Sequence, residues 1–508
     1  MSTITTPLEP PADATGDRED GLRSRSLYRA VWRWHFYAGL FAIPVIVLLC
    51  LSGIVYLFKP QVYGLMYGNL QTVTPAERTV SYQQQGDVVE RAYPGATVTA
   101  ILTPSEPTRS TQFDLTSAEG KDLSVFVNPY SGEVLGHRDN AKDIVKISKA
   151  LHGSLMTASW LGDEMYGDRF IEIVAGWSIV LVVTGIYLWW PRGQRRGLRG
   201  VLLPRFHLRG KRTLWRDVHA VTGILFAFVT MFFLVTGMAW TGWWGPKFLT
   251  AASDRFEVGT HGVYDGVASK TVGELLPNGQ SPWALGNLPL AASDTSHRGH
   301  TGHSAGGELR WDPRDGAPLD AVVASAQQLG VPHGFTITPP QDATGSYMIA
   351  YWEDGDMEAN RSATDMQVAH IDQYTAAPLA DYDFSDLGPA AQATNFSIAL
   401  HEGRQWGLVN QLMALTGALA ILLSVASATV MWRKRRPKGL SPPRKQPNRK
   451  LGFGVLVIII GLGALFPLLG LSMLIILALD FLVIQRVPRL ARIFGIDAVD
   501  RSRSAGQA

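Results

Sequence analysis

The chain has 508 residues, 46% of them hydrophobic, and a formal net charge of +3. Its hydrophobic residues gather in runs long enough to cross a bilayer, which excludes an ordinary soluble protein. The single cysteine, Cys50, lies inside the first of these runs, so an intramolecular disulfide is excluded. We expect a membrane protein with lipid around it and no nucleic-acid partner.

Residues 1–26 are polar and contain no early apolar stretch, which predicts a disordered tail rather than a cleaved signal peptide. Four apolar spans follow at about 30–58, 169–190, 217–243 and 408–432. A last apolar block, 452–484, is too long for one helix. Its Pro467 and Gly470 favour a hairpin of two short spans over one kinked helix.

The positive-inside rule predicts the orientation of the spans. Residues 191–216 and 433–450 each carry nine Lys or Arg and no acid, so both are expected in the cytoplasm. Residues 245–400 carry 19 Asp or Glu against 7 Lys or Arg and are expected outside. Both termini are then cytoplasmic, and the chain has about six spans.

The segments between the spans read as α+β modules. Residues 61–148 contain alternating β-branched stretches, and DLSVFVNPYSGEVLGHR predicts a hairpin with a Ser-Gly turn. The stretch MQVAHIDQYTAAPLADYDF aligns with it at a constant offset of 244, which places Tyr130 with Tyr374. The fold class is therefore an α-helical membrane protein made of two helix–external domain–helix halves, a C-terminal hairpin and two α+β external domains.

This interpretation divides the chain into consecutive segments. They are a cytoplasmic tail (1–26), the first span (27–60), external domain one (61–150), a histidine-bearing segment with the second span (151–192), a basic loop (193–214), the third span (215–244), external domain two (245–399), a histidine-bearing segment with the fourth span (400–433), a basic loop (434–450), the hairpin (451–487) and a tail (488–508).

Two spans repeat one pattern of histidine and glycine. His35 and Gly53 are 18 residues apart, as are His219 and Gly237. Eighteen residues make about five helical turns, so each pair is expected on one helix face. A further glycine follows each of these histidines by four residues, at Gly39 and Gly223. Such a face suggests a bulky flat ligand held between helices.

Two more histidines, His152 and His401, follow the external domains in Leu-His pairs. The topology places His35 and His219 near the cytoplasmic face and His152 and His401 near the external face. Neutral imidazole is an axial ligand of haem iron, and helix bundles build cofactor sites from facing side chains. A proton relay or metal pathway is the rival interpretation, and a lone histidine at a helix end is commonly an interface or capping residue.

Other polar residues are weaker candidates. Arg29, Arg33 and Arg216 flank the inner histidines and could pair with haem propionates, although they equally satisfy the positive-inside rule. His297, His300 and His303 lie in a glycine-rich loop that could collect a metal ion, but a flexible linker is favoured. Glu172 could be a proton carrier, a substrate contact or an ion-pair partner for Arg404, but interhelical hydrogen bonding is the favoured interpretation for Glu172 and Gln411. Ser52, Thr184 and Thr236 precede glycines and could bond backbone carbonyls.

The motifs WHFYAG, LHGSL, VLVVTGIYLWWPR, WRDVHAVTG and LHEGRQWGLVNQ resemble the PepSY-associated transmembrane family over roughly residues 27–436. Within that family the resemblance points to di-haem siderophore reductases of the bacterial inner membrane. It implies two haem b groups, with His35 and His219 holding the inner iron and His152 and His401 the outer one. It also implies a ferric siderophore or similar iron chelate as substrate.

The chain shows no G-x-G-x-x-G after a strand, no Walker A sequence and no paired C-x-x-C. Electrons are therefore expected from another molecule, a quinol or a soluble reductase. The alternative function is a haem-free permease or PepSY-type sensor that binds a siderophore, metal or peptide.

Overall fold

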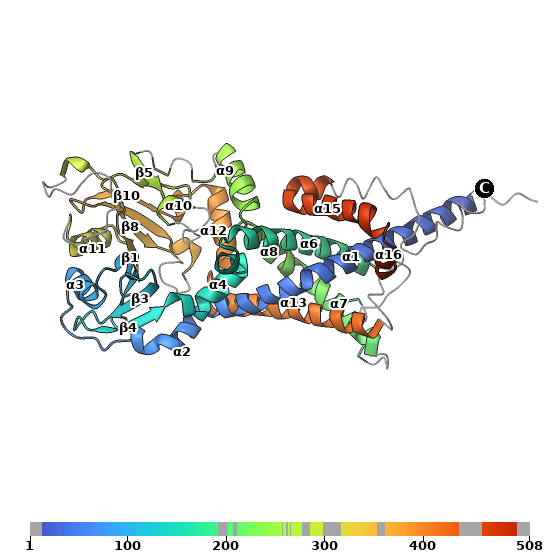
Figure 1. Cartoon of the computed structure of the whole chain (residues 1–508), viewed down its shortest axis with the longest axis horizontal. Coiled ribbons are helices and arrows are strands. Elements are labelled where there is room, and N and C mark those ends of the chain that lie inside the picture. The colour runs from blue at the N-terminus through green and yellow to red at the C-terminus, as the bar shows by residue number, and fades with distance from the viewer. Residues whose placement is uncertain are drawn as a thin grey trace, which may run out of the picture. The chain divides into compact units, whose positions relative to one another are not determined.

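The computed structural model describes residues 13–191, 201–206, 211–256, 258–260, 263–264, 266–276, 285–297, 316–352, 361–435 and 460–494. They divide into two compact units (Figure 1). The first is built from Met1–Val47, Arg169–Leu234 and Leu419–Ala508, and the second from Leu48–Asp168 and Val235–Ala418. Because α1 (Asp13–Leu57) and α13 (Gly407–Arg435) each run through a boundary, these two helices contribute residues to both units.

The first unit is helical. Besides parts of α1 and α13, it contains most of α6 (Met165–Trp189) and of α8 (Ala227–Met238), together with α7 (Lys211–Leu225), α15 (Pro467–Leu479), the π-helical η8 (Asp480–Ile484) and α16 (Pro488–Ile493). Small residues let these helices approach. A Cβ added at Gly176 in α6 would lie 3.0 Å from Leu469 Cβ in α15, and Trp177 Nε1 donates to Ser472 Oγ at 3.0 Å.

Four described helices are long and apolar enough to cross a membrane: Leu27–Leu57, Met165–Trp189, Gly407–Lys434 and Pro467–Ile484. They include three of the spans expected from the sequence. Residues 13–26, expected in a disordered tail, instead form the first turns of α1.

The third span is not the straight helix that the 18-residue spacing assumed. It is broken at Phe226 into α7 and α8, which are bent by 58°. Gly223, a poor helix former, lies in the last turn of α7, and no proline is present at the break. His219 and Gly237 therefore do not share a face of one continuous helix.

The last apolar block turns close to the expected position. Residues 460–465 are helical, the chain bends at Phe466, and α15 begins at Pro467. A Cβ at Gly470 would lie 2.6 Å from Gly463 Cα, so the two arms touch through glycine backbone. The start of the first arm, 451–459, lies outside the described residues.

The second unit contains one eight-stranded antiparallel sheet in the order β10-β9-β8-β7-β1-β2-β3-β4. The strands are β1 (Thr97–Leu102), β2 (Thr111–Thr116), β3 (Asp122–Val127), β4 (Val134–Asp139), β7 (Thr336–Thr338), β8 (Ser346–Tyr351), β9 (Gln367–Asp372) and β10 (Pro378–Asp383). β1 pairs with β7, with Ile101 opposite Ile337. Strands from the two segments expected as separate domains thus belong to a single sheet. Without this pairing β1 and β7 would be edge strands, and their backbone N–H and C=O groups would lack partners along that edge.

The predicted hairpin is β3–β4, and its turn includes Gly132 at φ 73°. The segment aligned with it forms β9–β10. Both turns use the same local hydrogen bond: Tyr130 N donates to Asn128 Oδ1 and Tyr374 N to Asp372 Oδ1, each at 2.9 Å.

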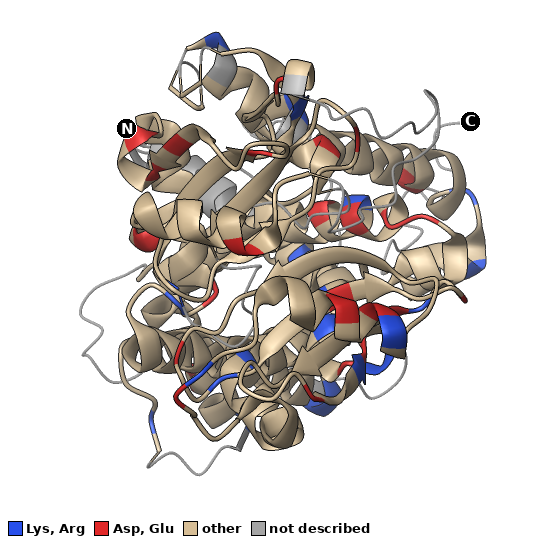
Figure 2. Cartoon of the chain, turned by 90° about the vertical axis from the view of Figure 1, so that its left-hand side faces the viewer, with Lys and Arg blue, Asp and Glu red and all other residues tan. Residues whose placement is uncertain are grey.

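Two helices cover one face of the sheet. α3 (Tyr82–Ala92) and α11 (Leu319–Gln328) enclose a core with residues of β1–β3 and β7–β9. Asp320 in α11 accepts from Tyr82 N at 2.9 Å and so caps α3. Acidic and basic residues are interspersed on this unit (Figure 2).

The other elements of this unit lie around the sheet or lead to the helices. They are α2 (Lys59–Gln71), η1 (Asn140–Lys142), α4 (Ile144–Ser154), α5 (Thr157–Leu161), η2 (Trp244–Thr250), α9 (Ala251–Arg255), β5 (Ala268–Thr271), α10 (Val272–Leu275), β6 (Pro289–Ala291), η4 (Thr295–His297), η5 (Ala363–Asp365), η6 (Phe384–Asp386) and α12 (Pro389–His401).

Candidate functional site

The first unit brings His35 of α1 and His219 of α7 together. Their ring centroids are 6.2 Å apart and their planes lie at 74°. The second unit brings together His152 of α4 and His401, the last residue of α12, with ring centroids 6.3 Å apart and planes at 85°. The four histidines therefore form the two pairs expected from the topology, one in each unit.

The Nδ1 atoms of the inner pair are held by neighbouring helices. His35 Nδ1 lies 2.9 Å from Thr184 Oγ1, and that hydroxyl donates to Val180 O at 2.5 Å, so it accepts from the imidazole. His219 Nδ1 lies 3.0 Å from Ser424 O, a carbonyl that can only accept. Both rings must carry their proton on Nδ1, and Nε2 then has the lone pair that coordinates a metal.

The outer pair is held in the same way. His152 Nδ1 donates to Leu49 O at 2.9 Å, with Ser52 Oγ at 3.4 Å. His401 Nδ1 lies 2.7 Å from Thr236 Oγ1. Desolvation lowers the pKa of His152, and desolvation together with the nearby His152 ring lowers the pKa of His401 to about 3. Both rings are neutral near pH 7, the protonation state that a metal ligand requires.

Three glycines leave room for these rings. A Cβ at Gly53 would lie 3.0 Å from His152 Cε1, one at Gly185 3.3 Å from His35 Cε1, and one at Gly237 3.5 Å from His401 Cε1. Each glycine follows the hydroxyl residue that neighbours the same histidine: Ser52, Thr184 and Thr236. In each Ser/Thr-Gly pair, the hydroxyl oxygen lies near Nδ1 of the histidine and the glycine leaves room for the imidazole ring. His219 departs from this pattern, since its partner is Ser424 O.

The ring spacing fits one iron between two imidazoles. Each metal–nitrogen bond is about 2.0 Å and each ring nitrogen lies about 1.1 Å from its ring centre, so opposed ligands place ring centres about 6.2 Å apart. Among the described residues no three His, Cys, Asp or Glu side chains gather as a metal-binding group. Two facing imidazoles could hold a metal whose remaining ligands come from another group, such as the macrocycle of a haem.

Sequence reasoning gave no role to the residues that fix the helices carrying His219 and His401. Asp217, two residues before His219, is buried and binds Arg205 through Nε at 2.7 Å and Nη2 at 2.9 Å. At the other site, Asn410 Nδ2 donates to Leu400 O at 3.0 Å, and its Oδ1 accepts from Gln405 N at 3.1 Å. The signal that could have identified Asp217 and Asn410 is their position inside the motifs WRDVHAVTG and LHEGRQWGLVNQ.

The arginines expected to pair with haem propionates have other contacts or are exposed. Arg216 pairs with Asp217 at 3.0 Å and Arg33 donates to Phe494 O at 3.1 Å, while Arg29 is exposed. Their role toward propionates stays a prediction.

Gln411 is buried, donates to Leu57 O at 2.9 Å and accepts from Gln61 at 3.1 Å, which is the expected interhelical role. Arg404 forms an ion pair with Glu402 at 2.8 Å. The side chain of His297, and all of His300 and His303, lie outside the described residues.

The comparisons with known proteins agree with this architecture. The family model described as "PepSY-associated TM region" matches residues 32–435. This match covers all four paired histidines and both halves of the sheet. No curated protein matches the chain.

Proposed function

The chain belongs to the PepSY-associated TM region family, and from this premise and its two histidine pairs we propose that it is a membrane oxidoreductase with two haem b groups. His35 and His219 hold one iron, and His152 and His401 hold the other. The observation that carries the proposal is the ring spacing of 6.2 and 6.3 Å, combined with a hydrogen bond on Nδ1 of every ring.

Each protein group has a definite part. The acceptors Thr184, Ser424 and Leu49 fix the tautomer with the proton on Nδ1, which would leave the lone pair of Nε2 for an iron and would increase the basicity of the imidazole. Gly53, Gly185 and Gly237 let the rings lie close against the helices. Bis-histidine haem supplies reversible one-electron transfer, and the protein tunes its potential by burial and by these hydrogen bonds.

The substrate proposal follows from the resemblance to siderophore reductases. With a haem held by His35 and His219 and another by His152 and His401, the chain would supply one-electron transfer from an external donor, a quinol or soluble reductase, to a ferric siderophore or iron chelate. The reduced Fe(II) is then released, because it is a poorer match for hard oxygen ligands. We place the protein in a bacterial inner membrane with both termini in the cytoplasm.

The test is the visible spectrum of the purified protein, oxidised and then reduced with dithionite, with haem and protein quantified. We expect a Soret band, sharp reduced α and β bands, and two haems per chain. A protein that stays colourless after haem supplementation would overturn the proposal and favour the haem-free permease or sensor.

The ligand assignment is tested by His401→Ala. This variant should lose one haem per chain and abolish reduction of the ferric chelate while keeping the spectrum of the inner haem. The matched control is His137→Ala, because His137 bonds Tyr93 OH in the sheet, away from both pairs. Retention of two haems in His401→Ala would refute the assignment.

A further inference from the structure

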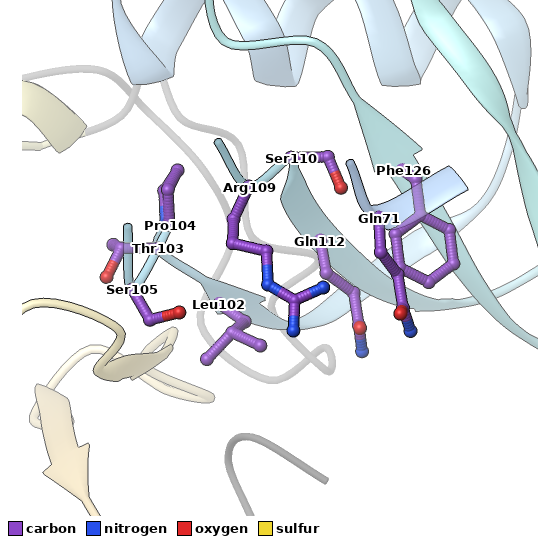
Figure 3. Close-up of a pocket in the computed structure, with 9 residues that line it drawn as sticks. All are labelled: Gln71, Leu102, Thr103, Pro104, Ser105, Arg109, Ser110, Gln112 and Phe126. Atoms are coloured by element: carbon purple, nitrogen blue, oxygen red, sulfur yellow. The ribbon is translucent and has the colours of Figure 1, made fainter. Parts of the chain in front are cut away.

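One cavity of the second unit is too small to hold an organic ligand. It lies where α2 ends beside the connection between β1 and β2, with Gln71, Thr103 and Gln112 in its lining (Figure 3). It has room for about one water molecule, which is enough to hydrate the buried carboxamide of Gln71. The surface of the helical first unit, by contrast, exposes large apolar side chains beside arginines.

These apolar side chains belong to a short loop, residues 201–206, that lies between α6 and α7 in the chain. Leu203 is 55% exposed and Phe206 is 74% exposed. Trp190, which directly follows the last residue of α6, is 62% exposed. Exposed apolar side chains that gather in one place, rimmed by polar residues, mark contacts with proteins or membranes.

The loop is fixed at two points, so the fold itself holds its apolar side chains at the surface. Trp189 Nε1, at the end of α6, donates to Val201 O at 2.9 Å. Arg205 binds Asp217 of α7 through Nε at 2.7 Å and Nη2 at 2.9 Å, and its backbone N donates to the same carboxylate at 3.3 Å. Leu203 lies between these two fixed points and is therefore presented outward.

Arginines accompany the apolar side chains. Arg212 and Arg216 lie four residues apart on α7, so they share one face of the helix, and both are exposed. Arg216 also contacts Asp217, from Nη2 to Oδ1 at 3.0 Å. Asp217 is the one acidic residue in the sequence from 201 to 219, so this surface has a net positive charge.

The membrane is the partner that this combination fits. Trp190 follows α6, a helix long and apolar enough to cross a membrane, and Arg212 begins the bent pair α7–α8, which passes the same test. The loop is tied to both, so it lies where these helices reach the bilayer surface. Aromatic residues at the ends of spans, with basic residues beside them, are typical of the lipid interface, and basic residues there attract anionic headgroups.

We propose that the loop at residues 201–206 docks on anionic phospholipid. Leu203 and Phe206 enter the boundary between headgroups and acyl chains, and Arg212 and Arg216 face the headgroup phosphates. The ion pair between Arg205 and Asp217 joins the docked loop to α7. This inference goes beyond the proposed function and does not depend on haem.

The depth of the loop is measured on the full-length protein in lipid nanodiscs with a nitroxide label. Leu202→Cys in a Cys50→Ser background puts the label on the loop and keeps Leu203 and Phe206. The control label is Ser131→Cys, in the exposed turn between β3 and β4. Power-saturation EPR compares collisions with oxygen, which enters lipid, and with a nickel chelate, which stays in water. In phosphatidylcholine with one third phosphatidylglycerol, the ratio of oxygen to nickel collisions should be several-fold higher for the loop label.

Two sets of changes separate the apolar contacts from the charged ones. Leu203→Ser with Phe206→Ser should lower the ratio at the loop label to that of the control label in either lipid composition. Arg212→Glu reverses one charge, so it should lower the ratio in the mixed nanodiscs toward its value in phosphatidylcholine alone. Arg91→Glu, at an exposed arginine of α3, is the matched control and should leave the ratio unchanged.

A second measurement needs no label. In detergent, dioctanoyl phosphatidylglycerol should raise the Tm of the wild type more than dioctanoyl phosphatidylcholine does, because only the first is anionic. Arg212→Glu should lose this difference, and Arg91→Glu should keep it. Equal shifts of the wild-type Tm with the two lipids would refute the preference for an anionic headgroup.

The EPR outcomes also decide the proposal. A loop label that is as accessible to nickel as the control label in both lipid compositions would overturn it. A loop label shielded from both reagents in every composition would also overturn it, since another segment of the chain would then cover the loop. An equal ratio with and without phosphatidylglycerol would contradict the recognition of anionic lipid. Neither readout requires haem, so the docking proposal can fail while the proposed function stands.

Discussion

At the residue scale, two features distinguish the paired histidines: the oxygen atom that lies within hydrogen-bond distance of Nδ1, and the glycine beside the ring, which has no side chain. Thr184 and Thr236 each contact a histidine through a hydroxyl and are followed by a glycine that the same ring approaches. The glycines four residues after the inner histidines behave differently: at Gly223 an added Cβ would meet nothing within 4 Å. The repeated spacing thus singled out Gly53 and Gly237 usefully, whereas Gly223 has no contact with a ring.

Gly53→Ala should weaken the outer site. The new Cβ would lie 3.0 Å from His152 Cε1 and 3.2 Å from Nδ1, so the ring must shift away from Leu49 O. Disturbing such a partner lowers metal affinity by about 10–100-fold. Haem per chain and the reduced spectrum should show partial loss of one haem. Gly223→Ala is the control and should keep both haems. Equal haem content in the two variants would contradict the role of Gly53 in making room for the His152 ring.

The burial of a neutral His370 predicts that the protein loses stability in acid. It is fully buried, accepts from Ala291 N at Nδ1 (2.9 Å) and lies 3.2 Å from Tyr382 OH through Nε2, so the neutral form is built into the fold. Desolvation lowers the pKa of His370 to about 4. Its folded pKa lies below its unfolded value near 6.5, so this stability is complete above pH 6.5 and is lost as the pH falls toward 4.

The loss attributed to His370 is roughly 3 kcal/mol over that interval. His370→Gln should reduce the dependence of Tm on pH between 6.5 and 4, because the imidazole of His370 then no longer has to be charged on unfolding. A slope as steep as that of the wild type would show that other groups govern the acid sensitivity.

At the element scale, a buried ion pair positions the helix that carries His152. Asp143 caps the N-terminus of α4 by accepting from Val145 N at 2.8 Å. The same carboxylate binds Arg138 Nε of β4 at 3.1 Å and accepts from Tyr63 OH of α2 at 2.8 Å. One carboxylate therefore joins the sheet, α2 and α4. The exposed fractions of Arg138 and Asp143 are 2% and 0%, so this is an interior contact.

Arg138→Leu should destabilise the protein strongly. It leaves Asp143 buried without its cation and removes a guanidinium that lies 4.4 Å from the Tyr63 ring. Breaking a buried pair in this way costs about 3–5 kcal/mol. The control is Lys142→Ala, which removes an ion pair with Asp139 whose lysine is 83% exposed and should cost about 1 kcal/mol or less. Thermal unfolding in detergent compares the two, and similar Tm values would refute the role of the pair.

At the scale of the whole molecule, the two halves of the sheet share one core. Ile101 and Ile337 lie opposite each other in the β1–β7 pair and both are fully buried. Phe113 and Val125 from the first half and Ile349 from the second belong to the same cluster. Neither half buries this surface alone, so the two should unfold together.

Ile337→Ala tests this cooperativity. The cavity should cost about 2–5 kcal/mol, and hydrogen exchange should speed up in β2–β3 and β8–β9 alike. Val267→Ala is the control, because Val267 is 77% exposed and its change should stay within about 0.5 kcal/mol. Faster exchange confined to β7–β9 would show that the halves unfold separately.

Local patterns in the sequence were enough to predict three of the apolar helices, the β3–β4 hairpin and the four histidines that the structure brings into pairs. Apolar runs, Ser-Gly turns and Leu-His pairs are local signals, and the constant offset of 244 linked Tyr130 to Tyr374 without any structure. The other features depend on contacts between segments that are distant in the sequence. The partners of Nδ1 lie 149, 165, 205 and 103 residues from their histidines. Two of them are the backbone carbonyl oxygens of Ser424 and Leu49, which no residue pattern marks. The bend at Phe226 and the joining of two half-sheets through β1 and β7 also depend on packing between distant segments, which no local propensity encodes.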